Sequence, residues 1–170
     1  MSTKYKKLLI IVSLLSIFVA LSAFRYYQVN KPFETYFVDE KIVLESETFR
    51  AGGLIFSYGP PMIEEREDHF HYEIPLHIAN DTNDHHYFYF ERFYLFSDLM
   101  YNRLALEDFL NHPMNENFTP EGIAPNSTED YILTFNLYKN WKVTEDSEII
   151  LYYKDDVDGG VIKYAYHIKK

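Results

Sequence analysis

The sequence predicts an all-β fold, a β-sandwich, preceded by one N-terminal transmembrane helix. Two observations predict the β domain: the chain holds 16 Tyr and 14 Phe among 170 residues, and several short segments alternate apolar with polar side chains. A third observation, an uncharged apolar run near the N-terminus, predicts the helix. The length of the chain suits one domain with its attachments.

Residues 1–27 are predicted to be a signal anchor that crosses the cell membrane once. Residues 8–24 carry no charge, and as a helix they would span about 25 Å, close to the thickness of the hydrocarbon core of a bilayer. Three lysines precede this run, which predicts a cytoplasmic N-terminus and an extracytoplasmic C-terminal domain. Cleavage at the small residues that end the run is the alternative, and it would give a secreted domain. Residues 28–38 are predicted to be a linker because Pro32 stands there among polar residues.

Residues 39–170 are predicted to form the extracytoplasmic β domain, and its first hairpin lies in "ETFRAGGLIFSY" (47–58). Gly52 and Gly53 divide this segment into two short apolar pieces, which predicts a tight hairpin or a bulge. A Gly-Pro-Pro turn (59–61) and an acidic loop are expected to follow, up to the next strand.

The clearest alternation lies in "HFHYEIPLHIA" (69–79), which predicts a strand with one buried face. The residues expected to face the core are Phe70, Tyr72, Ile74, Leu76 and Ile78. The residues expected on the opposite face are His69, His71, Glu73, Pro75 and His77. Because proline has no N–H to donate, Pro75 predicts either an edge strand or a break at that position.

The rest of the chain is predicted to supply further strands and one short helix. A turn at "NDTND" (80–84) leads to a strand at 85–96, which is expected to pair antiparallel with 69–79. A short helix is expected within 102–112. Later strands are expected at 129–138, 147–153 and 161–168, the last two joined by the turn "KDDVDGG". The expected core residues of 129–138 are Tyr131, Leu133, Phe135 and Leu137, and the apolar residues expected on faces opposite the core are Ile132, Tyr138, Ile150 and Tyr152. Several short strands joined by turns indicate a sandwich.

Five segments occur in an order that resembles a known family: "ESETFRAGGLIFSY", "YEIPLHIANDTND", "FYLFSD", "IAPNSTEDYILTFNL" and "IILYYKD". They are similar to the telokin-like, immunoglobulin-like domain of small surface proteins of Gram-positive bacteria. The resemblance covers about residues 40–168 and implies an immunoglobulin-like sandwich, an extracytoplasmic location and no catalytic residues. Many relatives carry an anchoring Cys, and this chain contains no Cys, so its anchor is expected to be the N-terminal helix.

Five of the seven histidines lie within residues 69–86. In the expected hairpin, His69 and His85 would lie near 30 Å apart, so they could not share one ion. We therefore expect a polar strand face and no metal. The alternative is a zinc or copper site near the hairpin tip, formed by His77, His85, His86 and Asp84. Asp156-Val157-Asp158-Gly159 resembles the start of a calcium loop, but no Glu follows it, which favours a hairpin turn.

The composition and the motifs argue against several classes of function. The absence of Cys excludes disulfides and thiolate metal sites, and a net charge of −10 argues against binding to nucleic acid. The sequence lacks G-x-S-x-G, H-E-x-x-H and a phosphate-binding glycine loop, so we expect neither an enzyme nor a cofactor. The expected function is a membrane-anchored extracytoplasmic binding domain for a protein or peptide partner. The alternative is a metal-binding envelope protein that uses the histidine-rich hairpin.

Overall fold

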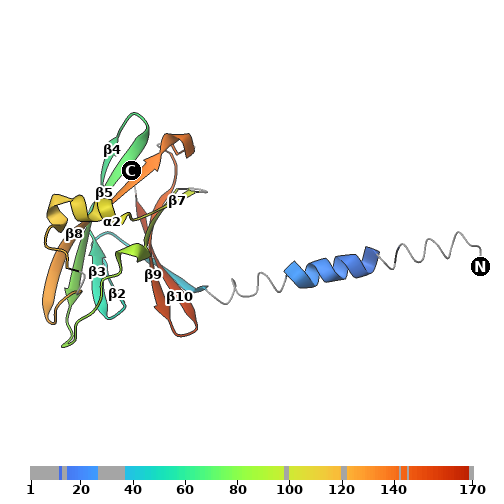
Figure 1. The fold of residues 1–170 in the computed structure, drawn as a ribbon, viewed down its shortest axis with the longest axis horizontal. Helices are drawn as coiled ribbons and strands as arrows, with labels where there is room; N and C mark the ends of the chain where they lie inside the picture. Colours follow the sequence, from blue (N-terminus) through green and yellow to red (C-terminus); the bar gives the residue numbers. More distant parts are fainter. Residues whose placement is uncertain are drawn as a thin grey trace, which may run out of the picture.

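The computed structural model describes residues 12, 15–26, 37–97, 100–119, 122–141, 143–144 and 146–168. Within these residues, ten strands form two five-stranded sheets that pack face to face as a β-sandwich (Figure 1). Residues 15–26 are helical. Among the described residues no helix is both long and apolar enough to cross a membrane, and most of the first half of the predicted anchor lies outside them.

Sheet A contains the two C-terminal strands that the sequence predicts. Its strands, in spatial order, are β1 (Phe37–Val43), β10 (Gly160–Ile168), β9 (Ile149–Val157), β6 (Phe93–Ser97) and β7 (Met100–Arg103). β1 runs parallel to β10, and the other pairs in the sheet are antiparallel. β1 begins inside the predicted linker, and neither β1 nor β7 was expected from the sequence.

Sheet B is built around β5, the strand with the clearest alternation. Its strands are β2 (Thr48–Ala51), β3 (Leu54–Tyr58), β4 (Met62–Glu65), β5 (His69–Asn80) and β8 (Ser127–Tyr138). β8 pairs with β5 along its whole length, so β3 and β4 share the other edge of β5, one after the other. The expectation of an acidic loop is therefore wrong for residues 62–65, which form β4. All four residues of β4 are exposed, and an exposed edge strand carries no alternation that a sequence could reveal.

Pro75 lies at the point where the partner of β5 changes from β3 to β4. The N–H of Gly59, in the segment between those strands, donates to the carbonyl oxygen of Pro75 at 2.9 Å. Because the N–H and C=O of one residue in a strand point to the same edge, the donor that proline lacks would face this junction and not β8. The predicted break is thus present, but β5 is a central strand and not an edge strand.

The predicted pairing of 69–79 with 85–96 is wrong. Residues 93–97 form β6 in sheet A, while His86 makes an isolated bridge to Ile123. The side chain of Asn80 donates to the carbonyl oxygens of Asp84 and Ile123, which fixes the loop after β5 in a path away from a hairpin. The aromatic side chain of Phe88 is buried at the end of the core, so its apolar character reflects core packing and not strand pairing.

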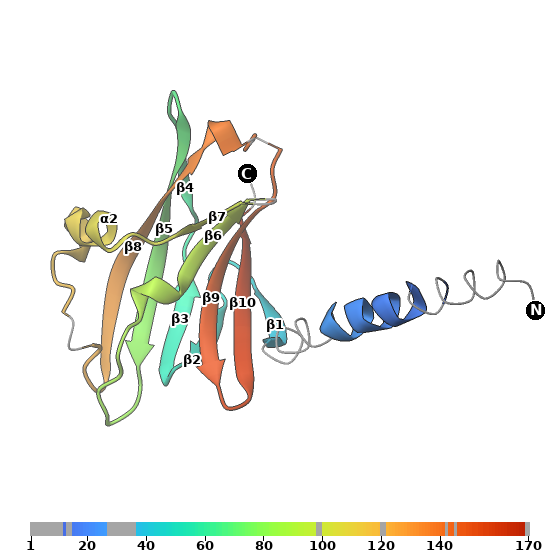
Figure 2. The ribbon, with the colours of Figure 1, turned by 45° about the vertical axis from the view of Figure 1, so that its right-hand side comes forward.

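The core lies between the sheets, and the alternation predicted for its two longest strands is confirmed. The five expected core residues of β5 are at most 6% exposed, and the four of β8 at most 4%. Four aromatic rings in mutual contact join the sheets: Phe49, Phe56, Phe93 and Tyr153. Thr134 is an exception to the alternation of buried and exposed residues in β8. It lies on the face away from the core and yet is only 6% exposed. The short helix predicted within 102–112 is present as α2 (Leu106–Asn111). With the 3₁₀ turn η2 (Pro113–Asn115) it packs against β8, a position that the sequence did not predict (Figure 2).

Candidate functional site: a groove on the outer face of sheet B

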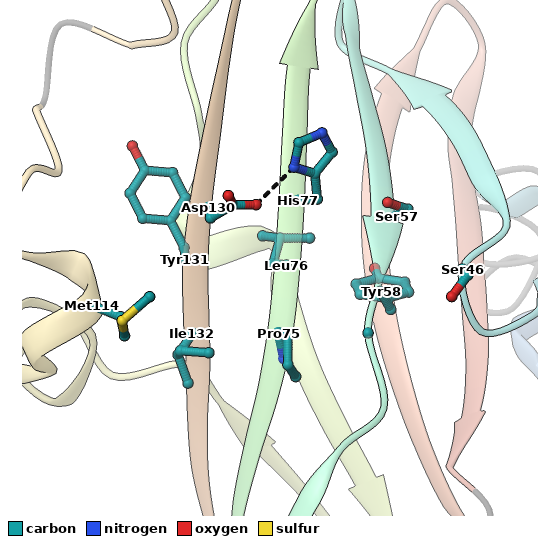
Figure 3. A pocket seen from close by; sticks show the side chains of 11 residues that line it. Ser46, Ser57, Tyr58, Pro75, Leu76, His77, Met114, Asp130, Tyr131 and Ile132 are labelled. Atoms are coloured by element: carbon teal, nitrogen blue, oxygen red, sulfur yellow. Dashed lines mark hydrogen bonds and ion pairs between the residues drawn. The ribbon is translucent and has the colours of Figure 1, made fainter.

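A hollow of about 340 Å³ lies on the outer face of sheet B, over β3, β5 and β8 (Figure 3). Pro75 and Ile132 face each other in the β5–β8 register and form its apolar floor. The floor needs a glycine beside it, because a Cβ atom at Gly59 would lie 2.9 Å from the Cβ atom of Pro75. We call this hollow, with its lining residues, the sheet B groove. The residues that line it are Ser46, Ser57, Tyr58, Gly59, Pro75, Leu76, His77, Met114, Asp130, Tyr131 and Ile132.

The wall of the groove is formed by Met114 of η2, and one buried side chain holds this wall against β8. Asn115 is 1% exposed. Its side-chain amide donates to the carbonyl oxygens of Phe109 at 2.7 Å and Ile132 at 2.9 Å, and its Oδ1 accepts from the N–H of Ile132 at 2.8 Å. Asn115 therefore makes the hydrogen bonds to the N–H and C=O of Ile132 that a neighbouring strand would make. Met114 projects beside the floor and is 59% exposed (Figure 3).

One end of the groove is polar and open to solvent. His77 Nδ1 lies 2.7 Å from Asp130 Oδ1, and the two side chains are 47% and 73% exposed. Ser57 lies opposite His77 in the register of β3 and β5. Burial raises the pKa of Tyr131 to about 12, so this phenol stays neutral.

A second hollow of about 290 Å³ adjoins the other end of the groove along β8. His71 and His112 line this hollow, and Glu73 Oε1 lies between their imidazoles, 3.3 Å from His71 Nε2 and 3.8 Å from His112 Nε2. His71 Nδ1 lies 2.7 Å from Asn136 Oδ1, so both of its ring nitrogens face oxygen atoms. The hydroxyl of Thr134, which lines the same hollow, has no hydrogen-bond partner among the described residues.

An acidic strand borders the second hollow. Glu64 lies opposite His71 in the register of β4 and β5. The hydrogen bond from Arg66 lowers the pKa of Glu64, and the charges of Arg66 and, more weakly, His71 act in the same direction. This end of the sheet therefore presents ionised carboxylates beside histidines, where a ligand could find both hydrogen-bond donors and acceptors.

The structure does not bring together the four residues of the alternative metal site. His77 contacts Asp130, and His85 is exposed. The ring of His86 lies over Gly53, with Nε2 at 3.0 Å from Thr82 Oγ1, while Asp84 accepts from Asn80 through its backbone. In the part of the chain that the structure describes, no group of three or more His, Cys, Asp or Glu side chains could hold a metal ion.

The histidine face also differs from its prediction. The side chains of His69 and His71 are only 15% and 17% exposed, because they contact Asp68 and Asn136, so they do not stand on an open solvated face. His112 was not foreseen, because only the packing of α2 and η2 on sheet B brings it near Glu73. In the predicted calcium-like segment, Asp156 lies near the end of β9 and Asp158 lies in the turn between β9 and β10, as the hairpin interpretation predicts.

No family model matches the sequence, and no curated protein matches it. Among solved structures, the chain is similar to an uncharacterized β-sandwich protein from Clostridium difficile 630, with 14% sequence identity and a TM-score of 0.47. The match covers 76% of this chain and 95% of the other.

Proposed function

We propose that this chain is a membrane-anchored, extracytoplasmic binding domain that performs no catalysis and holds a peptide segment of a partner protein in the sheet B groove. The observation that carries the proposal is the layout of the groove, an apolar floor between two ends rich in hydrogen-bonding groups. The apolar run and the lysines of residues 1–27 support the anchor.

We further propose that the sandwich is immunoglobulin-like and related to the telokin-like surface domains. In an immunoglobulin domain, strands G, F and C are neighbours in one sheet, and strands B and E in the other. Here β10, β9 and β6 occupy the first arrangement, and β5 and β8 the second, in the same chain order. The hairpin of β2 to β4 takes the position of strand A, and α2 with η2 takes that of strand D beside β8.

The size and chemistry of the groove support a peptide as the ligand. A volume of about 340 Å³ lies at the lower end of the range of small-molecule sites, and it suits one or two side chains. Pro75, Ile132 and Met114 offer apolar contact to such a side chain. His77, Asp130 and Ser57 can hydrogen-bond to the peptide backbone beside it.

Selection of random displayed peptides on the full-length protein in detergent micelles tests the proposal. We expect selected peptides to bind the wild type and to lose at least about tenfold in affinity to Ile132→Lys, which places a charge on the groove floor. Ile150→Lys is the matched control, because Ile150 is equally half-buried but lies on the outer face of sheet A. Failure to select any peptide, or equal loss in both variants, would contradict the proposal.

A further inference from the structure

The outer face of sheet A carries a cluster of aromatic rings that the core does not use. Phe96 stacks on Tyr101 with ring centroids 5.6 Å apart, and it meets Tyr152 edge to face at 5.0 Å. Tyr94 lies 6.1 Å from Tyr101 and pairs with Tyr152 in the register of β6 and β9. We call these four residues the aromatic face. Tyr101 is 60% exposed and the other three are half-buried, so the cluster is open to a ligand.

Three cations line one margin of the aromatic face. Lys154 Nζ lies 4.2 Å from the centroid of the Tyr94 ring, and Lys163 Nζ lies 5.4 Å from that of Tyr152. Arg103 lies opposite Tyr94 in the register of β6 and β7. The chain has a net charge of −10, so three cations beside exposed aromatic rings differ from its mostly acidic surface. The carboxylates of Glu40 and Glu148 also lie near Tyr152.

The cations are close enough to repel one another, although acidic groups stand nearby. Burial lowers the pKa of Lys154, and the charge of Lys163 lowers it further, while Asp156 raises it. Glu40 lies 3.9 Å from Lys163. Repulsion between the two lysines makes an additional anion favourable at this margin.

We propose that the aromatic face binds a short glycan that carries carboxylates, with sugar rings lying on the aromatic side chains and carboxylates contacting Lys154 and Lys163. The C–H groups of a sugar ring are slightly positive and suit the negative faces of aromatic rings. A neutral glycan would make no use of the lysines. Nucleic acid is a long polyanion that would extend past these cations onto the acidic remainder of the domain, which repels it, whereas a short glycan would not.

Calorimetric titration of the full-length protein with oligogalacturonate tests this proposal. We expect binding that weakens as salt rises, and none of comparable strength with the neutral galactose oligomer or with single-stranded DNA. Tyr101→Ala and Lys154→Gln should each weaken binding by about fivefold or more. Lys163→Gln gives a second, independent test of the lysine contacts.

Two matched controls separate a site from a general loss of structure. Tyr87→Ala removes a tyrosine that is 62% exposed and contacts Tyr89, outside the aromatic face. Lys139→Gln removes a lysine that lies over the Phe70 ring in sheet B. Both controls, and Ile132→Lys, should bind the oligomer as the wild type does. Absence of binding, equal binding of the neutral oligomer, tighter binding of DNA, or equal loss in the controls would each overturn the proposal.

Discussion

The two outer faces of the sandwich come from the same kind of alternating sequence, yet they differ in what covers them. On sheet B, α2 and η2 lie along β8 (Figure 2). The polar side chains of this face contact one another, as in His71–Asn136 and His77–Asp130. On sheet A, aromatic rings with lysines over them remain accessible. Exposure shows the contrast, since Thr134 on the first face is 6% exposed and Tyr101 on the second is 60% exposed.

The difference shows that alternation in a strand predicts which residues point away from the core. It does not predict whether another segment then packs on that outer face. A residue of β8 that points away from the core can still be buried if a helix packs on it. The predictions below test how far the two faces differ in their contribution to stability and in their charges.

The largest expected loss of stability comes from a substitution in the core, and it should exceed the loss from a substitution on the aromatic face. Phe135 is 1% exposed, so Phe135→Ala should lower the free energy of unfolding by about 3–5 kcal/mol. Phe96→Ala removes a half-buried ring that contacts other outer-face rings, and should cost about 1 kcal/mol. Urea unfolding of both variants measures the difference. Equal costs would mean that the aromatic face is as tightly packed as the core.

The wall of the sheet B groove should depend on one side chain. Asn115→Ala leaves the N–H and C=O of Ile132 and the C=O of Phe109 without their partner, and should cost about 2–4 kcal/mol in unfolding free energy. Asn102→Ala is the control, because it loses one hydrogen bond, to the carbonyl oxygen of Asn136, and should cost about 1 kcal/mol. If the two variants lost the same stability, Asn115 would not be what holds the wall in place.

A smaller change in stability, of opposite sign, is expected for a substitution of Thr134, which is buried beside that wall. Thr134→Val replaces a buried hydroxyl that has no hydrogen-bond partner among the described residues with a methyl group of similar size. This change should leave the unfolding free energy unchanged or raise it by up to about 1 kcal/mol. Thermal unfolding provides the measurement, and a loss of stability would show that the hydroxyl is hydrogen-bonded after all.

The contributions of two aspartates, Asp155 and Asp81, to stability should change in opposite directions as the pH falls. Burial raises the pKa of Asp155, despite the backbone N–H of Gly52 and the nearby Arg92, so the folded protein takes up this proton before the unfolded chain does. Its contribution to stability should therefore rise as pH falls from the raised pKa towards about 3.9. The hydrogen bond from Arg50 lowers the pKa of Asp81, so the contribution of this pair is present above about 3.9 and is lost as pH falls through the lowered pKa.

Urea unfolding of Asp155→Asn and Asp81→Asn over a series of pH values checks these signs. Relative to the wild type, the unfolding free energy of Asp155→Asn should fall as the solution is acidified. Asp81→Asn should cost stability at neutral pH and approach the wild type in acid. The same pH trend in both variants would contradict the assigned environments.

The sequence was informative where one face of a strand is buried, and uninformative where contacts come from distant segments. β5 and β8 bury every second residue, so their faces could be predicted, and so could the outward position of Ile150 and Tyr152. The partner of β5 could not, because adjacent segments favour a hairpin and nothing local indicates pairing with β8. The groove was missed for the same reason, since Asn115 and His112 lie in an irregular segment without periodicity.

The parallel pairing of β1 with β10 has a consequence for the order in which the domain folds. These are the first and last strands described in the chain, and Phe37 pairs with Val161. β1 lacks its partner in this sheet until β10 has been synthesised, whereas β3, β4 and β5 are neighbours in sequence and can pair early. Closure of sheet A should therefore be the late, slow step of folding. A chain that is threaded through a membrane pore as it is made would keep this sheet open until its last strand emerges.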